Sequence, residues 1–119
     1  WATDHPRGEG ERYGETAIGK GPIISRGPNI NPVVHKGIVA TAKKHKIPIQ
    51  PLAMPRCTGT DANSMQLSRG GVATGLIGIP NRYMHTPVEL VSLKDVENAS
   101  ILIAEWITSL KGNTSFIPN

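Results

Sequence analysis

The chain has 119 residues, 38% hydrophobic and 18% charged, so it is one domain or part of one, and no apolar run approaches the roughly 18–20 residues of a membrane span. The net charge is +4, but the basic residues are scattered and have almost no aromatic neighbours, so we expect neither a nucleic-acid partner nor a membrane. A single cysteine excludes an intrachain disulfide and a cysteine-rich zinc site, and it is compatible with a reducing cytoplasm.

The chain begins with a polar, glycine-rich segment over residues 1–20, which has no apolar periodicity and is predicted to be a loop. Residues 21–25 (Gly-Pro-Ile-Ile-Ser) then predict a short strand. The next four residues, 26–29 (Arg-Gly-Pro-Asn), are typical of a turn that leads into a helix.

The first helix is predicted to begin at Pro32 and to end near Lys46. Asn31 is a favourable N-cap, and proline fits the first helical position because no backbone N–H is needed there. Apolar residues at four-residue spacing predict its buried face, namely Val34, Ile38 and Ala42. Residues 47–53 are then extended, and their two prolines predict a sheet edge because proline cannot donate a ladder hydrogen bond.

A second helix is predicted from Thr60 or Asp61 through Arg69, with a glycine pair at 70–71 as its C-terminal cap. Residues 72–79 (Val-Ala-Thr-Gly-Leu-Ile-Gly-Ile) are the most apolar stretch, and we expect them to form the most buried strand. These two elements continue the alternation of helix and strand.

The last helix is predicted to begin after Ser92, which forms a capping box with Asp95 in the first turn. A 3-4-3-4 spacing predicts its buried face, namely Val96, Ala99, Ile103, Trp106 and Leu110. Residues 113–119 are expected to form an irregular tail. The alternating strand–helix units predict an α/β fold, part of a mostly parallel sheet with helices packed on it.

Two polar loops follow predicted strands, and such loops meet at one edge when the strands of an open sheet are parallel. In the first, Gly59, Thr60 and Asp61 lie at a helix N-terminus, where backbone amides can bind an anion. Capping by Thr60 or Asp61 explains the same residues, and it is the preferred interpretation from the local sequence alone.

The second loop, residues 81–89, offers His85 as a metal ligand or general base. Glu89 could accept the second imidazole N–H and fix its tautomer, and Arg82 could bind a carboxylate. A surface histidine beside solvated charges is the alternative, since a zinc site needs three or four ligands. The remaining histidines do not complete a set: His5, His35 and His45.

Three motifs occur in a familiar order: residues 21–32 (Gly-Pro-Ile-Ile-Ser-Arg-Gly-Pro-Asn-Ile-Asn-Pro), 59–62 (Gly-Thr-Asp-Ala) and 82–85 (Arg-Tyr-Met-His). With Glu89 and the capped final helix, they resemble the C-terminal portion of the dinuclear metallo-aminopeptidases. This is the family of glutamyl aminopeptidases and TET peptidases, some of whose members were labelled endoglucanase M. The resemblance covers nearly all of residues 1–119.

The resemblance implies a catalytic domain with two bound metal ions, zinc or cobalt, that removes N-terminal residues from peptides by a metal-activated water. It also implies a large cytoplasmic homo-oligomer, often a dodecamer. On this sequence it assigns His85 as a metal ligand and Glu89 as a residue that supports it. Gly59, Thr60 and Asp61 would lie near the substrate cleft, and Arg82 would help to bind substrate.

The family's other ligands, its general-base glutamate and its inserted oligomerisation domain all precede the matched region. We therefore expect a parent aminopeptidase, no catalytic residue in this chain, and no activity from the chain alone, because metal-activated hydrolysis needs several ligands and a base. The alternative is a self-standing, non-catalytic α/β module for assembly or ligand binding that retains the motif.

Overall fold

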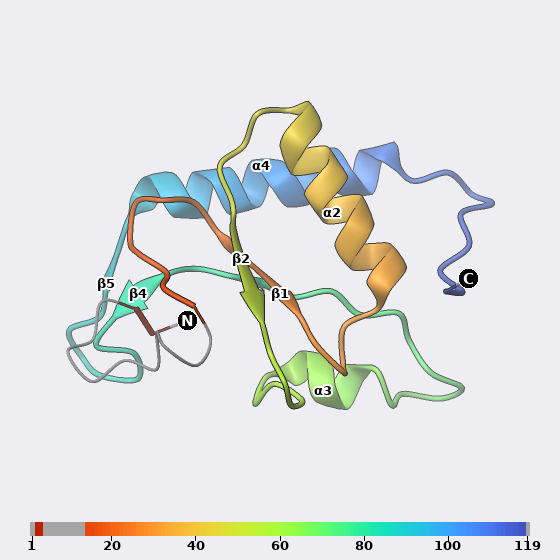
Figure 1. Ribbon diagram of the computed structural model, residues 1–119, viewed down its shortest axis with the longest axis horizontal. Coiled ribbons are helices and arrows are strands. Elements are labelled where there is room, and N and C mark those ends of the chain that lie inside the picture. Colours follow the sequence, from red (N-terminus) through yellow and green to blue (C-terminus); the bar gives the residue numbers. More distant parts are fainter. Residues whose placement is uncertain (1, 4–13, 119) are drawn as a thin grey trace.

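The computed structural model describes residues 2–3 and 14–118, so most of the loop predicted over residues 1–20, including His5, lies outside the described residues. A small sheet is covered by two long helices (Figure 1). The elements in chain order are β1 (Ile23–Arg26), α2 (Pro32–Lys44), β2 (Gln50–Ala53), α3 (Asp61–Met65), β3 (Ile77–Gly78), β4 (Asn81–Arg82), β5 (Leu90–Val91) and α4 (Leu93–Ser109). The predicted α/β class is confirmed.

The sheet has the strand order β2-β1-β3. β1 pairs with β2 in parallel, with Ile23 opposite Gln50, and β2 lies at an edge as its prolines predicted. β3 pairs with β1 in the antiparallel direction, with Ile23 opposite Gly78. The expected parallel arrangement therefore holds for β1 and β2 only, and the sheet of the described residues is mixed.

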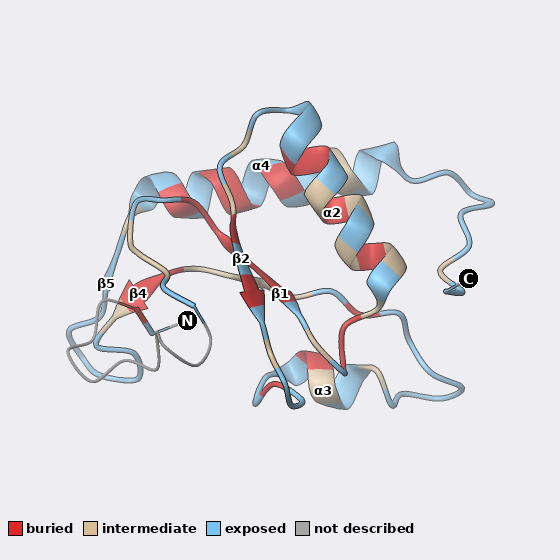
Figure 2. Cartoon of the chain, in the orientation of Figure 1, coloured by how far each residue is buried: buried red, intermediate tan, exposed pale blue. Residues whose placement is uncertain are grey.

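The core lies where the two helices meet the sheet. Its buried members are Ile24 from β1, Leu102 from α4, and the three α2 residues predicted from the four-residue spacing, Val34, Ile38 and Ala42. Figure 2 shows buried residues along β1 and β2 and on parts of both helices, while much of α4 is exposed. Among the described residues, no helix combines the length and apolar character needed to span a bilayer.

Asn31 begins α2 as its sequence predicted. Its side-chain oxygen accepts the N–H groups of Val33 at 2.9 Å and Val34 at 3.1 Å, and Pro32 occupies the first turn. The Asn31 amide nitrogen donates to the Phe116 carbonyl at 2.9 Å, so the same side chain also holds the C-terminal tail. The irregular tail is thereby fixed to the start of the helix.

Two predicted elements are shorter than expected. α3 has five residues instead of extending to Arg69, and the Thr60 side chain makes no capping hydrogen bond. Of residues 72–79, only Ile77 and Gly78 form a strand. The preceding residues bond to the turn after β1, since Thr74 Oγ1 donates to the Asn29 carbonyl at 2.7 Å and the Thr74 carbonyl accepts the Asn31 N–H at 2.8 Å. The most buried strand is therefore β1.

The final helix begins at the predicted cap, but its buried face is rotated from the predicted one. Ser92 caps the helix through the Asp95 N–H at 3.4 Å. The buried side chains face inward in one stripe, namely Asp95, Asn98, Ala99 and Leu102. Three residues of the predicted face are at least a third exposed, namely Val96, Ile103 and Leu110. Two residues of the buried stripe, Asp95 and Asn98, are polar. The spacing of apolar residues therefore predicted the neighbouring stripe instead.

Candidate functional site

The loop that carries His85 is closed at its base by a two-stranded ribbon. Asn81 pairs with Val91 and Arg82 pairs with Leu90, so β4 and β5 hold the two ends of the loop together. The Asn81 carbonyl also accepts the Thr3 N–H at 2.8 Å on its other side. The base of the loop is therefore fixed from two directions.

Within the loop, two residues adopt a left-handed backbone although neither is glycine. Tyr83 has a φ of 60° and His85 a φ of 65°. A turn supports the first of them, because the Thr86 hydroxyl donates to the Tyr83 carbonyl at 2.6 Å. His85 is exposed, so its imidazole is accessible to a ligand or metal ion.

The carboxylate of Glu89 contacts the main chain of His85. One oxygen accepts the His85 backbone N–H, and the other accepts the Asn81 side-chain amide at 3.0 Å. The expected contact was with the imidazole N–H. These two bonds instead connect Glu89 to the main chain of His85 and to the side chain of Asn81.

These residues can supply part of a metal site. Over the described ranges, 2–3 and 14–118, no three or more His, Cys, Asp or Glu residues come together as a metal site would require. Structural and catalytic zinc sites use at least three protein ligands. A metal ion at His85 would therefore need ligands from outside these ranges.

The loop with Gly59, Thr60 and Asp61 lies at the other end of the sheet. β2 runs parallel to β1 and leads to α3, whereas β3 runs the opposite way and leads to the β4–β5 ribbon (Figure 1). The two loops were expected to meet at one edge if their strands were parallel. β3 is antiparallel, so this condition is not met in this chain.

The Gly-Thr-Asp-Ala motif instead meets the turn after β1. The Asn29 amide nitrogen donates to Thr58 Oγ1 at 2.8 Å, and Asn29 Oδ1 accepts the Thr58 N–H at 3.2 Å. Thr58 Oγ1 and Thr60 Oγ1 are 2.7 Å apart. Asn29 was expected only to be a turn residue, because nothing in the local sequence pattern pairs it with Thr58.

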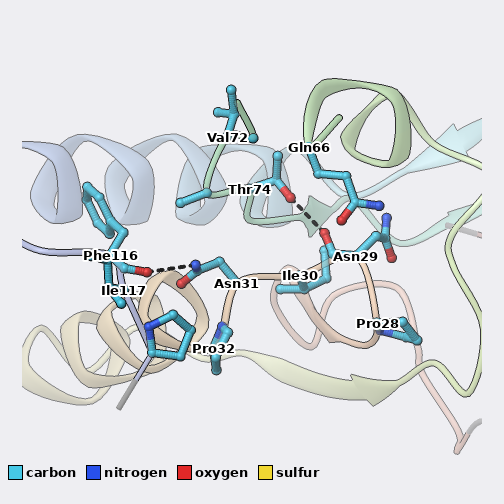
Figure 3. A pocket seen from close by; sticks show the side chains of 13 residues that line it. Pro28, Asn29, Ile30, Asn31, Pro32, Gln66, Val72, Thr74, Phe116 and Ile117 are labelled. Carbon is cyan, nitrogen blue, oxygen red and sulfur yellow. Dashed lines mark hydrogen bonds between the residues drawn. The ribbon is translucent and has the colours of Figure 1, made fainter. Parts of the chain in front are cut away.

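A second feature that the sequence did not indicate is an open cavity of about 580 Å³ at the start of α2 (Figure 3). It lies among the turn after β1, residues 71–74 and the tail, which the bond between Asn31 and the Phe116 carbonyl holds beside it. None of the described residues that line it has a titratable side chain. These residues can accommodate a neutral group, but they offer no acid or base.

His35 lies apart from the His85 loop, on α2, and predicts a pH dependence of stability. Burial, with a smaller effect of the Arg26 charge, lowers the pKa of His35 from 6.5. The unfolded chain therefore binds the proton more readily, so stability is full above pH 6.5 and falls as the pH drops through that value.

In urea unfolding at pH 7.5 and 5.5, His35→Gln should lose less stability on acidification than the wild type. Lys36→Gln, exposed and next in sequence, should keep the wild-type difference; equal losses in all three proteins would contradict the prediction.

Comparisons with known proteins place these loops in a family. The model of the M42 glutamyl aminopeptidases matches residues 2–102. The chain is 49% identical over 94 residues to a lysyl aminopeptidase of Pyrococcus furiosus, covering 79% of this chain and 27% of that protein. It spans under a third of that relative's length.

Solved structures agree with the sequence match. A TET aminopeptidase from the archaeon Thaumarchaeota archaeon SCGC AB-539-E09 superimposes with a TM-score of 0.75 at 36% identity, over 82% of this chain and 28% of the other. The TET1 peptidase of Pyrococcus horikoshii, which can assemble into a tetrahedron or a large octahedral shell, gives 0.72 at 26% identity, over 92% of this chain and 31% of the other. Since the family model spans most of the chain, and the fold and a close relative agree with it, this chain belongs to the M42 glutamyl aminopeptidase family.

Proposed function

We propose that this chain is the C-terminal part of a metal-dependent aminopeptidase, in which His85 supplies one ligand to a site for two divalent ions, zinc or cobalt. The observation that carries the proposal is the exposed His85 on a loop whose backbone is held by Glu89, in a chain of the M42 family. The other ligands and the general base would come from the part of the relatives' length that this chain does not span.

The residues of this chain fit one side of such a site. A ring nitrogen of His85 would bind the metal, and bound divalent ions supply the acidification of water that peptide hydrolysis requires. Arg82, in β4 at the base of the same loop, would orient a carboxylate of the peptide. Gly59, Thr60 and Asp61 would lie near the substrate cleft of the whole protein, as the family resemblance implies; within this chain they follow β2, at the end of the sheet away from the His85 loop.

The substrates would be peptides with a free N-terminus, and the protein would work as a homo-oligomer in the cytoplasm. Oligomerisation is supported by the shell-forming TET1 relative. A reducing compartment is supported by Cys57, which is exposed and unpaired among the described residues. No observation favours the alternative of a non-catalytic module.

Hydrolysis of aminoacyl p-nitroanilides tests the proposal directly. A protein of the relatives' length that carries this chain should cleave them, lose activity in chelator, and regain it with zinc or cobalt. The isolated 119-residue chain should neither turn over nor hold stoichiometric metal. Chelator-resistant activity would contradict metal dependence, and turnover by the isolated chain would contradict the missing ligands.

A further inference from the structure

The Glu89 carboxylate joins two separate parts of the His85 loop. One oxygen accepts the backbone N–H of His85, and the other accepts the amide nitrogen of Asn81 at 3.0 Å. Asn81 opens the loop in β4, and Glu89 immediately precedes β5. A single side chain therefore connects the base of the loop to the residue that carries the imidazole.

The His85 backbone needs such support. Its φ of 65° lies in the left-handed region, and Tyr83, two residues earlier, has a φ of 60°. L-residues other than glycine adopt this region rarely and keep it where neighbouring contacts hold them there. Since the backbone sets the direction of the Cα–Cβ bond and limits the allowed rotamers, the contact that holds φ at His85 also restricts where the imidazole can point.

Asn81 gives the contact a rigid anchor. An exposed glutamate by itself samples several rotamers, so one hydrogen bond would hold it weakly. Asn81 is 6% exposed, and its main chain is held by the Val91 pairing and by the Thr3 N–H. Its amide nitrogen faces the carboxylate, while its Oδ1 is buried and has no hydrogen-bond partner among residues 2–3 and 14–118. Leaving that oxygen unpaired costs free energy. The same orientation of the Asn81 amide, however, lets its nitrogen donate to Glu89.

We propose that Glu89 is a positioning residue that acts on the main chain of His85, with Asn81 as its anchor. It fixes the left-handed backbone that presents the imidazole, and it does so without contacting the imidazole N–H. The consequence for metal binding rests on the proposed function, whereas the hydrogen bond between Glu89 and the His85 main chain does not depend on that function.

Amide hydrogen exchange, measured by NMR on the 119-residue chain, tests whether Glu89 holds the His85 main chain. Glu89→Gln has nearly the same shape, but it carries no charge and replaces one of the two acceptor oxygens by a donor, so the two present bonds to a charged acceptor cannot both be kept. The His85 amide should exchange about tenfold faster or more, because a hydrogen bond to a charged group is lost. The imidazole ¹⁵N shifts should stay as in the wild type. An unchanged His85 exchange rate would overturn the proposal, as would a change in imidazole tautomer without one.

Two further variants separate positioning from folding. Glu97→Gln makes the same chemical change at an exposed site on α4, where Glu97 pairs with Lys94, and it should leave His85 exchange unchanged. Asn81→Leu removes the donor and the unpaired oxygen together, so it should keep the urea midpoint while still raising the His85 exchange rate. Adding it to Glu89→Gln should have no further effect, since Asn81 acts through Glu89. Equal acceleration in Glu97→Gln, or fully additive effects, would overturn the proposal.

Metal affinity in a protein of the relatives' length distinguishes this inference from the proposed function. Glu89→Gln should weaken zinc binding by about tenfold, the range found when a residue that orients a ligand is changed. If His85→Ala leaves the metal content unchanged while Glu89→Gln still raises the His85 amide exchange rate, the proposed function is wrong but Glu89 does position the His85 main chain. If His85→Ala removes metal while the His85 amide exchange rate in Glu89→Gln is unchanged, the positioning role of Glu89 is wrong but the proposed function is supported.

Discussion

His85→Ala, in a protein of the relatives' length that carries this chain, is expected to lower kcat/KM for an aminoacyl p-nitroanilide by about a thousandfold or more. A metal ion that loses a ligand loses occupancy and geometry, and with them the acidic bound water on which hydrolysis depends. Metal content, measured by mass spectrometry after dialysis, should fall in parallel. The loop itself should survive, because its main-chain contacts do not use the imidazole.

His45→Ala is the matched control for this prediction. His45 is exposed at the end of α2, where its ring nitrogen lies 3.5 Å from a Glu105 carboxylate oxygen, far along the chain from the loop. Losing an exposed pair changes stability by about 1 kcal/mol or less, so activity and metal content should match the wild type. Wild-type metal content in His85→Ala would mean that His85 is not a ligand.

Asp95→Ala is expected to destabilise the 119-residue chain by about 3–5 kcal/mol. The side chain is 0% exposed, and its two oxygens accept the Gly19 N–H at 2.6 Å and the Gly21 N–H at 2.8 Å. Alanine would leave the Gly21 donor buried without a partner and would open a cavity. Both effects act at the place where the segment before β1 is tied to α4.

The backbone at Gly21 has little room to move toward β2 to relieve this loss. Its φ is 97°, and a Cβ at this position would lie 2.1 Å from the Pro48 carbonyl oxygen, so it is packed directly against the main chain before β2. Urea unfolding followed by circular dichroism gives the loss of stability. Asp95→Asn, which keeps one acceptor oxygen, should lose less. The exposed Glu97→Ala should change stability by at most about 0.5 kcal/mol, and an equally small loss for Asp95→Ala would refute the account.

The parts of the fold that local chemistry determines were predictable. Asn31 and Pro32 marked the start of α2, Ser92 marked the start of α4, and the prolines marked β2 as an edge strand. The buried face of α4 was not predictable from apolar spacing, because the carboxylate of Asp95 occupies it and finds partners far away in sequence. Strand direction is likewise a property of the assembled sheet, so the antiparallel β3 was missed.

The candidate site divides in the same way. His85 and Glu89 were recognisable as a pair of residue types, and the structure brings them into contact. The contact is made by the main chain of His85. Its left-handed backbone was not expected, because the residue is not glycine. Asn81 was missed because its part depends on burial and on strand pairing, which its own residue type does not reveal. The approach of Gly59–Asp61 to His85 was expected only for parallel strands, and the direction of β3 could not be predicted from its sequence.

The proposed role of His85 as a metal ligand can be observed directly. An anomalous-scattering map, recorded at the absorption edge of the bound metal from crystals of a protein of the relatives' length, should show a metal peak about 2.0–2.1 Å from a ring nitrogen of His85. Metal peaks with complete ligand sets that leave the His85 imidazole beyond bonding distance would contradict it.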